Sequence, residues 1–378
     1  MATNGSQFLA EPVAPPKINI PTSKETVQVR VINQEIGLAF SMPPDTFFSP
    51  ATPGFTDLSM PIFAFVISHG DHHIMFDAGI RRDWQSLSPA VVGMLTKMAA
   101  FPPVEQDVLD ILESDTSGLG IGLEDIEALI WSHHHFDHTG DPSRFPSSTK
   151  LVVGPELKEM LSAGYPANKD AMILDSDAAG REVVSVDFSQ GLQIGGFAAH
   201  DYFGDGSFYL LHAPGHTPGH MCALARTTYD EASGESTFVF LGADACHHPG
   251  VLRPNEYLPL PCSINPSPFP SQRATHTVCP GHTLQGLLVH KQPNKPVFEL
   301  KEGPMFWDII LSQQTVRGMQ KLDVNTRIFI ILAHDKSLVG NMPMFPKAVN
   351  NWFEEGVGEE TRWRFFQDCE SVVLNKSS

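Results

Sequence analysis

The segment 132–138 reads SHHHFDH, and its histidines and aspartate have the spacing of metal ligands. Residues i and i+2 of an extended chain point the same way, so His133 and His135 can hold one ion together. Asp137 and His138 lie around the next bend and can face a second ion. The pattern HxHxDH would arise by chance in roughly two of a thousand chains of this length. A polar surface loop would not explain its place directly after an apolar strand, so the pattern favours a metal site.

Three further residues of ligand type each end a predicted apolar strand. They are His216 in APGHTPGH, Asp244 in FVFLGAD and His334 in RIFIILAHD. A zinc site needs more ligands than one loop can supply, so the metal hypothesis requires residues of this kind. Alone, each is more often a capping or core-edge residue than a ligand. Together with the first segment, the three favour one shared metal centre.

Strand-like and helix-like patterns alternate in two successive blocks, which is typical of a two-layered α/β unit. The sequence predicts strands over the ranges 27–33, 61–68, 74–79, 150–154, 182–189, 192–202, 207–215, 221–227, 236–244 and 327–335. Residues 123–132 predict a helical turn that leads into an apolar strand ending at Ser132. Helical patterns lie at 88–114, where Phe101-Pro102-Pro103 splits two short helices, and at 155–161, 304–322 and 352–370. Residues 1–26 predict a flexible arm, the Pro-rich interval 247–300 a functional or disordered insertion, and residues 346–378 a helical extension.

Composition excludes several classes of partner. The chain has 378 residues, and 43 Asp and Glu against 25 Lys and Arg give a formal net charge of -18. An acidic surface repels phosphate backbones and no Lys/Arg-rich run is present, so we expect no nucleic-acid partner. Five Cys without a CxxC pair fit reduced thiols better than a disulfide framework. No leader-like segment and no run of about 18 apolar residues is visible, which predicts a cytoplasmic protein with no membrane partner.

The order HxHxDH, distant His, distant Asp, distant His resembles that of the metallo-β-lactamase superfamily. The segments SHHHFDHTGD, PGHTPGH and AHD are most similar to those of its N-acyl-homoserine lactonase branch. The resemblance covers residues 27–345, which we therefore expect to form one catalytic domain. It implies an α/β fold, the four-layer αββα sandwich, with a dinuclear site at one edge of the sheets.

The resemblance also implies which residues hold the metals. One zinc ion would be bound by His133, His135 and His216, the other by Asp137, His138 and His334, and Asp244 would bridge the two. Iron, manganese or cobalt could replace zinc. Asp77, in the motif FDAG, would orient a ligand histidine from behind, and the alternative is a strand-end turn former. His220 would support the site by packing or hydrogen bonding.

Such a centre implies a hydrolytic mechanism. Two zinc ions about 3.5 to 4 Å apart can share a hydroxide, which supplies a nucleophile near neutral pH. The chain has no GxSxG element that would supply a serine instead. We therefore expect attack on the carbonyl of a small neutral lactone or ester, polarised by the metal on His133, His135 and His216. Asp137 would pass a proton to the leaving alkoxide, so that a lactone yields a hydroxy acid.

His247 stands where homoserine lactonases have a tyrosine, three positions after the bridging Asp244. Its ring could donate a hydrogen bond to the carbonyl oxygen or to the leaving group. The alternative is that His247 and His248 are two solvated loop residues before Pro249. His282, in CPGHTLQG, echoes PGHT but follows no clear strand, so we interpret it as a turn residue.

The nearest alternative function is a metal-dependent thioesterase of the glyoxalase II or polyketide-releasing kind. Such an enzyme needs positive charge near its entrance for glutathione or phosphopantetheine, which the charge of -18 does not favour, and the same charge disfavours a nuclease. A diiron oxidoreductase usually has Glu at position 135, where this chain has His, whereas a mono-iron dioxygenase stays open to metal analysis. The alternative of another class is a non-catalytic metal-binding scaffold, but degenerate relatives usually lose ligands, and all seven are present here.

Two groups of apolar residues have alternative interpretations. Tyr257, Leu258, Leu260 and Phe269 of the insertion, or Met94, Leu95, Met98 and Phe101 of the helical stretch, could roof an apolar cleft, although plain core packing is more frequent. A homodimer face is compatible with Phe306, Trp307 and Ile310, or with the tail residues Trp352, Phe353, Trp363, Phe365 and Phe366. Packing inside one chain would explain both of these aromatic groups equally well.

Overall fold

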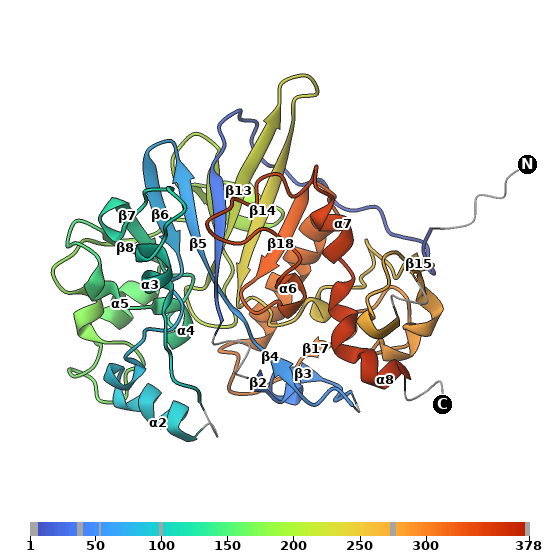
Figure 1. Cartoon of the computed structure of the whole chain (residues 1–378), viewed down its shortest axis with the longest axis horizontal. Coiled ribbons are helices and arrows are strands. Elements are labelled where there is room, and N and C mark those ends of the chain that lie inside the picture. The colour runs from blue at the N-terminus through green and yellow to red at the C-terminus, as the bar shows by residue number, and fades with distance from the viewer. Residues whose placement is uncertain (1–6, 36–40, 53, 98–100, 273–276, 375–378) are drawn as a thin grey trace, which may run out of the picture.

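Two six-stranded β-sheets pack face to face in the centre of the molecule, and helices cover the outer faces (Figure 1). The structure is a computed structural model that describes residues 7–35, 41–52, 54–97, 101–272 and 277–374. The first sheet has the order β1 (Gln28–Gln34), β5 (Ile62–His69), β6 (His72–Phe76), β7 (Ile126–Ile130), β8 (Lys150–Val153) and β9 (Val183–Ser185). The second has the order β10 (Gln193–Ile194), β11 (Phe197–Asp201), β12 (Phe208–His212), β13 (Met221–Asp230), β14 (Glu235–Ala243) and β18 (Ile328–Leu332). The predicted αββα sandwich is confirmed.

Helices of very different length surround this sandwich. α3 (Val108–Glu113) and α5 (Leu157–Leu161) pack on the outer face of the first sheet, and α6 (Ile309–Asp323) packs on that of the second. α2 (Pro89–Lys97) lies beside the single turn α4 (Phe136–Thr139), and α7 (Val357–Thr361) and α8 (Glu370–Leu374) belong to the C-terminal segment. Three two-residue pairs complete the fold: β2 (Ser41–Met42) with β4 (Leu58–Ser59), β3 (Phe48–Ser49) with β17 (Glu299–Leu300), and β15 (Ser263–Ile264) with β16 (Cys279–Pro280).

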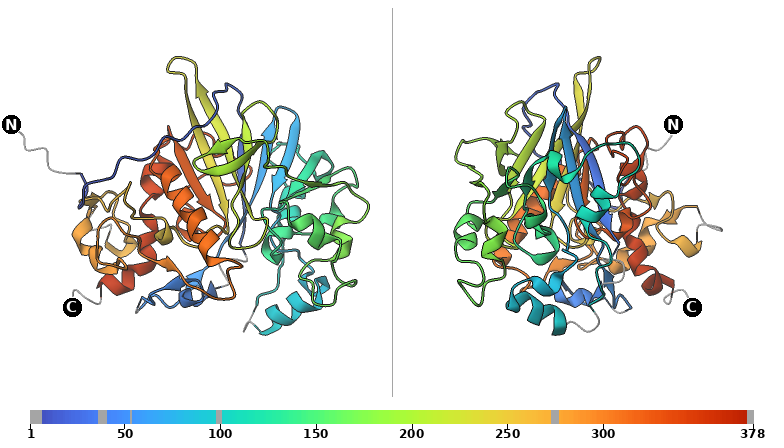
Figure 2. Two further views of the ribbon diagram at one scale, coloured as in Figure 1. Left: turned by 180° about the vertical axis from the view of Figure 1, so that it is seen from behind. Right: turned by 60° about the vertical axis from the view of Figure 1, so that its left-hand side comes forward.

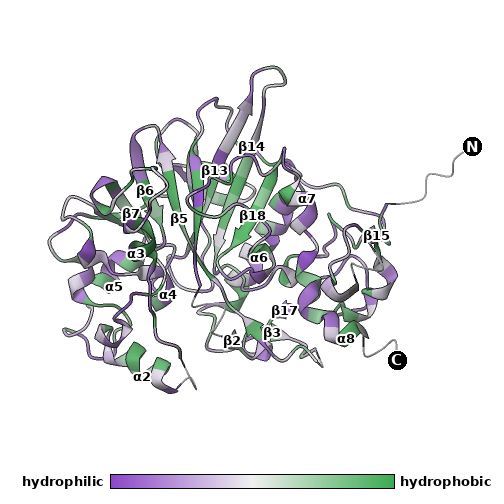
Figure 3. Ribbon diagram, in the orientation of Figure 1, coloured by the Kyte–Doolittle hydropathy of each residue, from purple (hydrophilic) through white to green (hydrophobic). Residues whose placement is uncertain are grey.

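The side chains of strand β5 alternate between two layers of the hydrophobic core. Successive side chains of a strand point to opposite faces, so Phe63, Phe65 and Ile67 enter the core between the sheets. Ala64 and Val66 enter the core beneath the helices. A strand buried on both faces is apolar over its buried length, and Figure 3 shows hydrophobic colour along most of β5, whose last two residues are Ser68 and His69.

Helices α3 and α6 begin where the sequence supplies a capping aspartate. The Asp107 carboxylate accepts a hydrogen bond from the Asp110 backbone N–H at 2.9 Å, and Asp308 accepts one from the Leu311 N–H at 2.9 Å. Because of this cap, α6 begins at Ile309, five residues later than the predicted range. Between α2 and α3, residues 101–104, which include both prolines, are not helical, as the sequence predicts.

The strand directions bring the chemistry-bearing residues to one edge. β6 and β7 are parallel, with Phe76 opposite Ile130, and β14 and β18 are parallel, with Leu241 opposite Ile331. β12 runs parallel to β14 because both are antiparallel to β13 between them. Parallel strands end at the same edge of a sheet. The segments that follow β6, β7, β12, β14 and β18 therefore meet at one end of the sandwich.

Most of the apolar residues of the insertion that could have roofed a cleft pack into the core instead. Tyr257 is the exception, because it is half-buried and lines a cavity beside α6. Leu258, Leu260 and Phe269 are buried in the same cluster as the inner face of α6. The roof interpretation is therefore wrong for these three residues, because the insertion wraps the outer face of the second sheet. In α2, Leu95 is buried beneath the helix and Met94 is 37% exposed, while Met98 lies outside the described residues.

The N-terminal segment runs along the outside of the molecule from the insertion to the first strand (Figure 2). Its backbone is held at intervals: the Leu9 N–H donates to the Leu260 carbonyl at 2.9 Å, and Arg226 donates to the Pro21 carbonyl at 2.7 Å. These contacts hold residues 7–26 in an extended path along the surface. In the described ranges, the longest helix has 15 residues and none has the length and apolar character needed to cross a membrane.

Candidate metal centre

The first half of the site gathers three histidines around one oxygen of Asp244. Ligand-type atoms of His133, His135, His216 and Asp244 all lie within 4.8 Å of one another. His216 Nε2 lies 2.9 Å from His135 Nδ1, and Asp244 Oδ2 lies 3.4 Å from His216 Nε2. Three segments that follow different strands thus converge on one point, as the sequence predicted.

The second half uses the other oxygen of the same carboxylate. Ligand-type atoms of Asp137, His138, Asp244 and His334 also lie within 4.8 Å of one another. Asp244 Oδ1 lies 3.2 Å from His138 Nε2 and 3.0 Å from His334 Nε2. Because Oδ1 faces one group and Oδ2 the other, Asp244 joins two adjacent candidate cation sites.

A short turn places the four residues of the first motif. The extended chain after β7 carries His133 and His135, and α4 then holds Asp137 and His138 in one helical turn. Gly140 ends this turn with φ +58°, where a Cβ would lie 2.5 Å from the Ala78 side chain. The last position of HxHxDHxG is therefore glycine because the backbone there passes close to the segment after β6.

Asp77 orients two of the histidines from behind. It is fully buried, and its carboxylate accepts hydrogen bonds from the Ser132 N–H at 2.7 Å and the Ser132 hydroxyl at 2.8 Å. His138 Nδ1 lies 2.8 Å from Asp77 Oδ2, and His133 Nδ1 lies 3.0 Å from the Ser132 hydroxyl. Both rings therefore turn Nε2 toward Asp244, which fixes the tautomer a metal needs.

Two further contacts hold the other side of the site. His334 Nδ1 lies 2.7 Å from the Pro61 carbonyl oxygen, so its Nε2 is also directed at Asp244. His220 is buried, and its Nε2 accepts a hydrogen bond from the Asp244 backbone N–H at 3.3 Å. His220 is therefore placed to position the strand-end aspartate and lies outside both ligand groups.

The polar atoms at this site fit a pair of cations. The Nε2 atoms of His133, His138 and His334 and Oδ1 of Asp244 are buried without a hydrogen-bond partner among the described residues. Leaving buried polar atoms unsatisfied costs free energy, and metal binding removes that cost. Imidazole nitrogens with carboxylate oxygens form a donor set that suits zinc and neighbouring divalent transition metals.

The electrostatics of the site also suit cations. Burial lowers the pKa of His133, His135 and His216 well below the usual histidine value, which keeps these rings neutral. Burial would raise the pKa of Asp244, but His334, His138 and His247 hold it well below its usual range. In the second group, burial would lower the pKa of His138 and His334, but the neighbouring carboxylates, Asp244 foremost, raise it. Metal binding there would release these protons, because neutral imidazoles and an ionised carboxylate are the forms that bind metal.

The two consecutive histidines after β14 point in different directions. His247 is 1% exposed; its Nε2 lies 3.2 Å from Asp244 Oδ2, and its ring stacks on Phe47 at 4.2 Å. His248 is 3% exposed and turns away, accepting the Gly250 N–H at 2.9 Å and facing Asp368 at 3.3 Å. Their burial contradicts the alternative of two solvated loop residues. His282 lies in a short 3-10 turn outside both ligand groups, as predicted.

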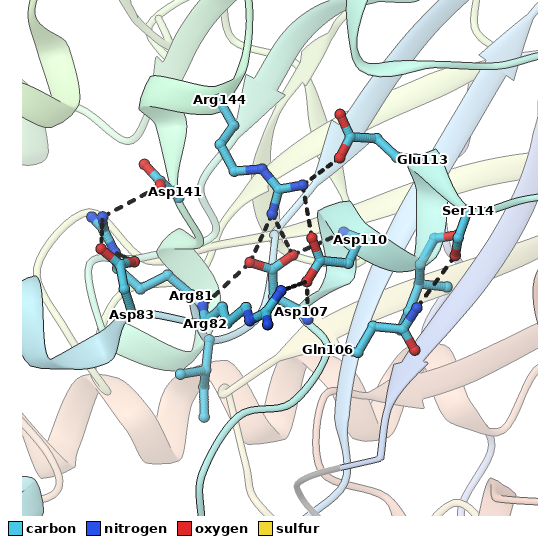
Figure 4. A network of polar contacts seen from close by, with 12 residues as sticks. Arg81, Arg82, Asp83, Gln106, Asp107, Asp110, Glu113, Ser114, Asp141 and Arg144 are labelled. Atoms are coloured by element: carbon cyan, nitrogen blue, oxygen red, sulfur yellow. Dashed lines mark hydrogen bonds and ion pairs between the residues drawn. The ribbon is translucent and has the colours of Figure 1, made fainter.

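Figure 4 shows a network of ion pairs that stabilises the chain around the first metal-binding motif, residues 133–138. Arg81 pairs with Asp83 at 2.7 Å and with Asp141 at 3.3 Å, three residues after His138. Arg144 then pairs with Asp107 at 2.8 Å, at the start of α3. These residues were not predicted from the sequence, because charged residues in loops carry no signal of which partners they will meet.

Aromatic residues distant in sequence border the site and were not predicted to do so. The Phe306 ring lies 6.0 Å from that of His216 and 6.2 Å from that of His247. The backbone N–H of Trp307 donates to the His216 carbonyl at 3.0 Å. The start of α6 therefore supports the loop that carries His216, and its capping Asp308 is the signal that could have located it.

Comparisons with known proteins agree with this geometry. Residues 60–226 match the family described as the Metallo-beta-lactamase superfamily. The metallo-hydrolase mfmC of Annulohypoxylon moriforme is 48% identical over 357 residues, which cover 94% of this chain and 91% of the relative. The gamma-lactamase FDB1 of Fusarium pseudograminearum (strain CS3096) is 39% identical over 363 residues, which cover 94% of this chain and 85% of the relative.

Other matches extend the comparison to a longer protein and to a solved fold. The cytochrome P450 monooxygenase mpaDE of Penicillium roqueforti (strain FM164) is 43% identical over 98% of this chain, which spans only 40% of that relative. A solved N-acyl homoserine lactone hydrolase, with the product N-hexanoyl-L-homoserine at its catalytic metal centre, has a TM-score of 0.52 at 16% identity. That comparison covers 87% of this chain and 100% of the other.

Proposed function

Because the chain belongs to the metallo-β-lactamase superfamily and is a metal-dependent hydrolase, we propose that it opens a small neutral lactone or lactam ring. The observation that carries this proposal is the position of Asp244, whose two oxygens face two separate ligand groups. The gamma-lactamase name of one relative supports an amide as well as an ester bond. The active centre would be His133, His135, Asp137, His138, His216, Asp244 and His334.

The protein's own residues would bind the metals, orient the site and move a proton. Two divalent cations, zinc foremost with iron, manganese or cobalt as alternatives, supply Lewis acidity and an activated water when bound. Asp137 is the more accessible carboxylate, with a side chain 13% exposed against 3% for Asp244. We assign Asp137 the transfer of a proton to the leaving oxygen or nitrogen of the ring.

The two cysteines whose thiols lie nearest Asp244, Cys222 and Cys246, do not offer a competing nucleophile. Cys246 lies two residues after Asp244, but it is fully buried, and burial raises the pKa of its thiol far above the usual value. The pKa of Cys222 is likewise raised well above the usual value by burial. A thiol that stays protonated is a poor nucleophile, which supports hydrolysis by activated water.

Two exposed apolar side chains at the start of α6 are candidates for contact with an apolar part of the substrate. Trp307 is 59% exposed and Ile310 58% exposed, and both flank the start of α6 beside the His216 loop. Of the tail aromatics, Trp352, Trp363, Phe365 and Phe366 are buried, so packing inside the chain accounts for them, whereas Phe353 is 39% exposed. We assign Trp307 and Ile310 to substrate contact, in preference to a homodimer face.

The first test is a substrate panel run alongside metal analysis. We expect about two divalent metal ions per chain and turnover of lactones or lactams, with longer apolar substituents lowering KM. Chelation should remove activity and metal together, and adding the metal back should restore both. Faster turnover of matched thioesters would favour the thioesterase, and iron with oxygen uptake would favour the dioxygenase. Full activity of metal-free protein would contradict the proposal.

A second test concerns His247. One of its ring nitrogens faces Asp244 and the other is buried without a hydrogen-bond partner among the described residues. We propose that the ring donates a hydrogen bond to a substrate oxygen. His247→Ala should then lower kcat/KM about a hundredfold while the metal content stays unchanged.

The neighbouring His248 provides the matched control, because it is equally buried and faces Asp368 in the C-terminal segment. His248→Ala should affect stability more than kcat/KM. If His247→Ala loses metal in proportion to activity, the residue is a ligand and the hydrogen-bond role is wrong. Unchanged kcat/KM would remove His247 from the mechanism altogether.

A further inference from the structure

A cavity of about 510 Å³ lies against α6, away from the metal centre. This volume falls in the range of small-molecule pockets, about 300 to 1,000 Å³. Its walls come from the turn between β10 and β11, the end of β12, one face of α6, and the insertion at 255–257 and 294–296. Figure 2 shows α6 in the view from behind, with the gold insertion to one side of it. None of the seven proposed metal ligands lines this cavity.

The walls of this cavity are basic in an otherwise acidic protein. Lys295, Arg317 and Lys321 line it, and Glu256 is the single acidic residue among the lining residues. In the part of the chain that the structure describes, none of the three cations forms an ion pair with a carboxylate. A chain with a net charge of -18 therefore presents a local excess of positive charge here.

The positions of the two cations on α6 reduce the stability of the helix. Arg317 and Lys321 are four residues apart, so they lie on one face of α6 and repel each other. Lys295 approaches the same space from the insertion. A shared anion would turn this repulsion into attraction, and the planar guanidinium can bind a carboxylate or phosphate with two parallel hydrogen bonds.

The end of β12 forms the inner wall of the cavity. His212, its last residue, is half-buried and is one of the lining residues. Its side chain follows Phe208 and Leu210 toward the core between the sheets, where it stacks on Phe188 at 5.0 Å. Recognition of a ligand in the cavity therefore depends on Lys295, Arg317 and Lys321.

From this geometry we propose that the cavity binds a small anion whose carboxylate or phosphate groups pair with Arg317, Lys321 and Lys295. The site is separate from the proposed ring-opening reaction and does not depend on it. It does share a wall with the loop that carries His216: Pro214 lines the cavity, and the Thr315 hydroxyl donates to the Pro214 carbonyl at 3.0 Å. A bound anion would therefore stabilise the packing of α6 against this loop.

The test is calorimetric titration of the metal-loaded full chain with inorganic phosphate and, separately, with succinate at constant ionic strength. Arg317→Gln with Lys321→Gln should weaken binding of at least one anion tenfold or more, about 1.4 kcal/mol. Lys158→Gln with Lys169→Gln removes the same charge from exposed positions elsewhere and should bind like the wild type. Any anion held by the metal centre is common to all three proteins and cancels in the comparison.

The two anions separate the two sources of the ligand. Binding of phosphate alone indicates a phosphate ester, binding of succinate alone a carboxylic acid, and either result supports the site. Lys295→Gln, at an exposed loop position, gives a second variant if the helix variant does not fold. No heat with either anion, or equal affinity in the wild type and the cavity variants, would overturn the proposal.

Discussion

Asp244→Asn is expected to lower kcat/KM by about a thousandfold or more and to leave the purified protein poor in metal. The substitution keeps the shape of the side chain but removes its negative charge. Five histidine Nε2 atoms lie within 3.7 Å of its two oxygens, those of His133, His138, His216, His247 and His334. An amide cannot offer an anionic oxygen to both ligand groups, so both halves of the centre should weaken at once.

The measurement is metal content per chain together with kcat/KM on the best substrate of the panel. Asp201→Asn is the matched control, because that carboxylate accepts hydrogen bonds from the Gly204 and Gly206 N–H groups, in a loop after β11. The control should keep metal and activity. If Asp244→Asn binds two metals per chain and turns over normally, Asp244 does not bridge the centre, and the proposed mechanism is wrong.

The positions of the metal-binding residues could be predicted because each follows a strand whose pattern is legible in the sequence. Apolar runs ending in His or Asp locate strand ends, and parallel strands bring their ends to one edge. His216, Asp244 and His334 were therefore expected beside the first motif, and the structure brings them together. The spacing separated His133 and His135 from Asp137 and His138. The resemblance then assigned His216 and His334 to the two groups and Asp244 to both.

What could not be predicted depends on contacts between distant segments. The sequence alone does not tell which of His247 and His248 faces the metal centre. Two neighbouring residues of the same type differ only in the direction in which the folded backbone points their side chains. Phe47 meets His247 across about 200 residues of chain. The same holds for the insertion. Leu258 and Phe269 lie in a stretch without a periodic hydrophobic pattern, so the sequence does not reveal that they are buried against α6. Their positions follow from tertiary packing, which no local pattern records.

Arg253→Met is expected to lower the free energy of unfolding by about 3 to 5 kcal/mol near neutral pH. Arg253, in the insertion, pairs with Asp323 at the end of α6 through hydrogen bonds of 2.7 and 2.6 Å, and both side chains are buried. Arg253 also donates to the Arg362 carbonyl at 2.7 Å. Removing the guanidinium leaves a buried carboxylate with much weaker compensation.

The pH dependence of this loss has a definite sign. In the wild type, burial would raise the pKa of Asp323, but Arg253 lowers it below the usual value. The pair therefore contributes stability above the ordinary aspartate pKa of about 3.9, and this contribution is lost as the pH falls through the depressed value. In Arg253→Met, burial outweighs the remaining effect of Arg362 and should raise the pKa. The folded variant then binds the extra proton, so its deficit should shrink as the pH falls from about 8 to about 5.

The double variant Arg253→Met with Asp323→Leu distinguishes loss of the pair from loss of packing. Replacing both partners by apolar side chains removes the unpaired charge, so chemical denaturation should show most of the lost stability restored. Folded Arg253→Met should keep its metal content and kcat/KM, because neither partner belongs to the ligand groups around Asp244. A single-variant loss below about 1 kcal/mol would mean that the pair behaves like an exposed one and does not anchor the insertion to α6.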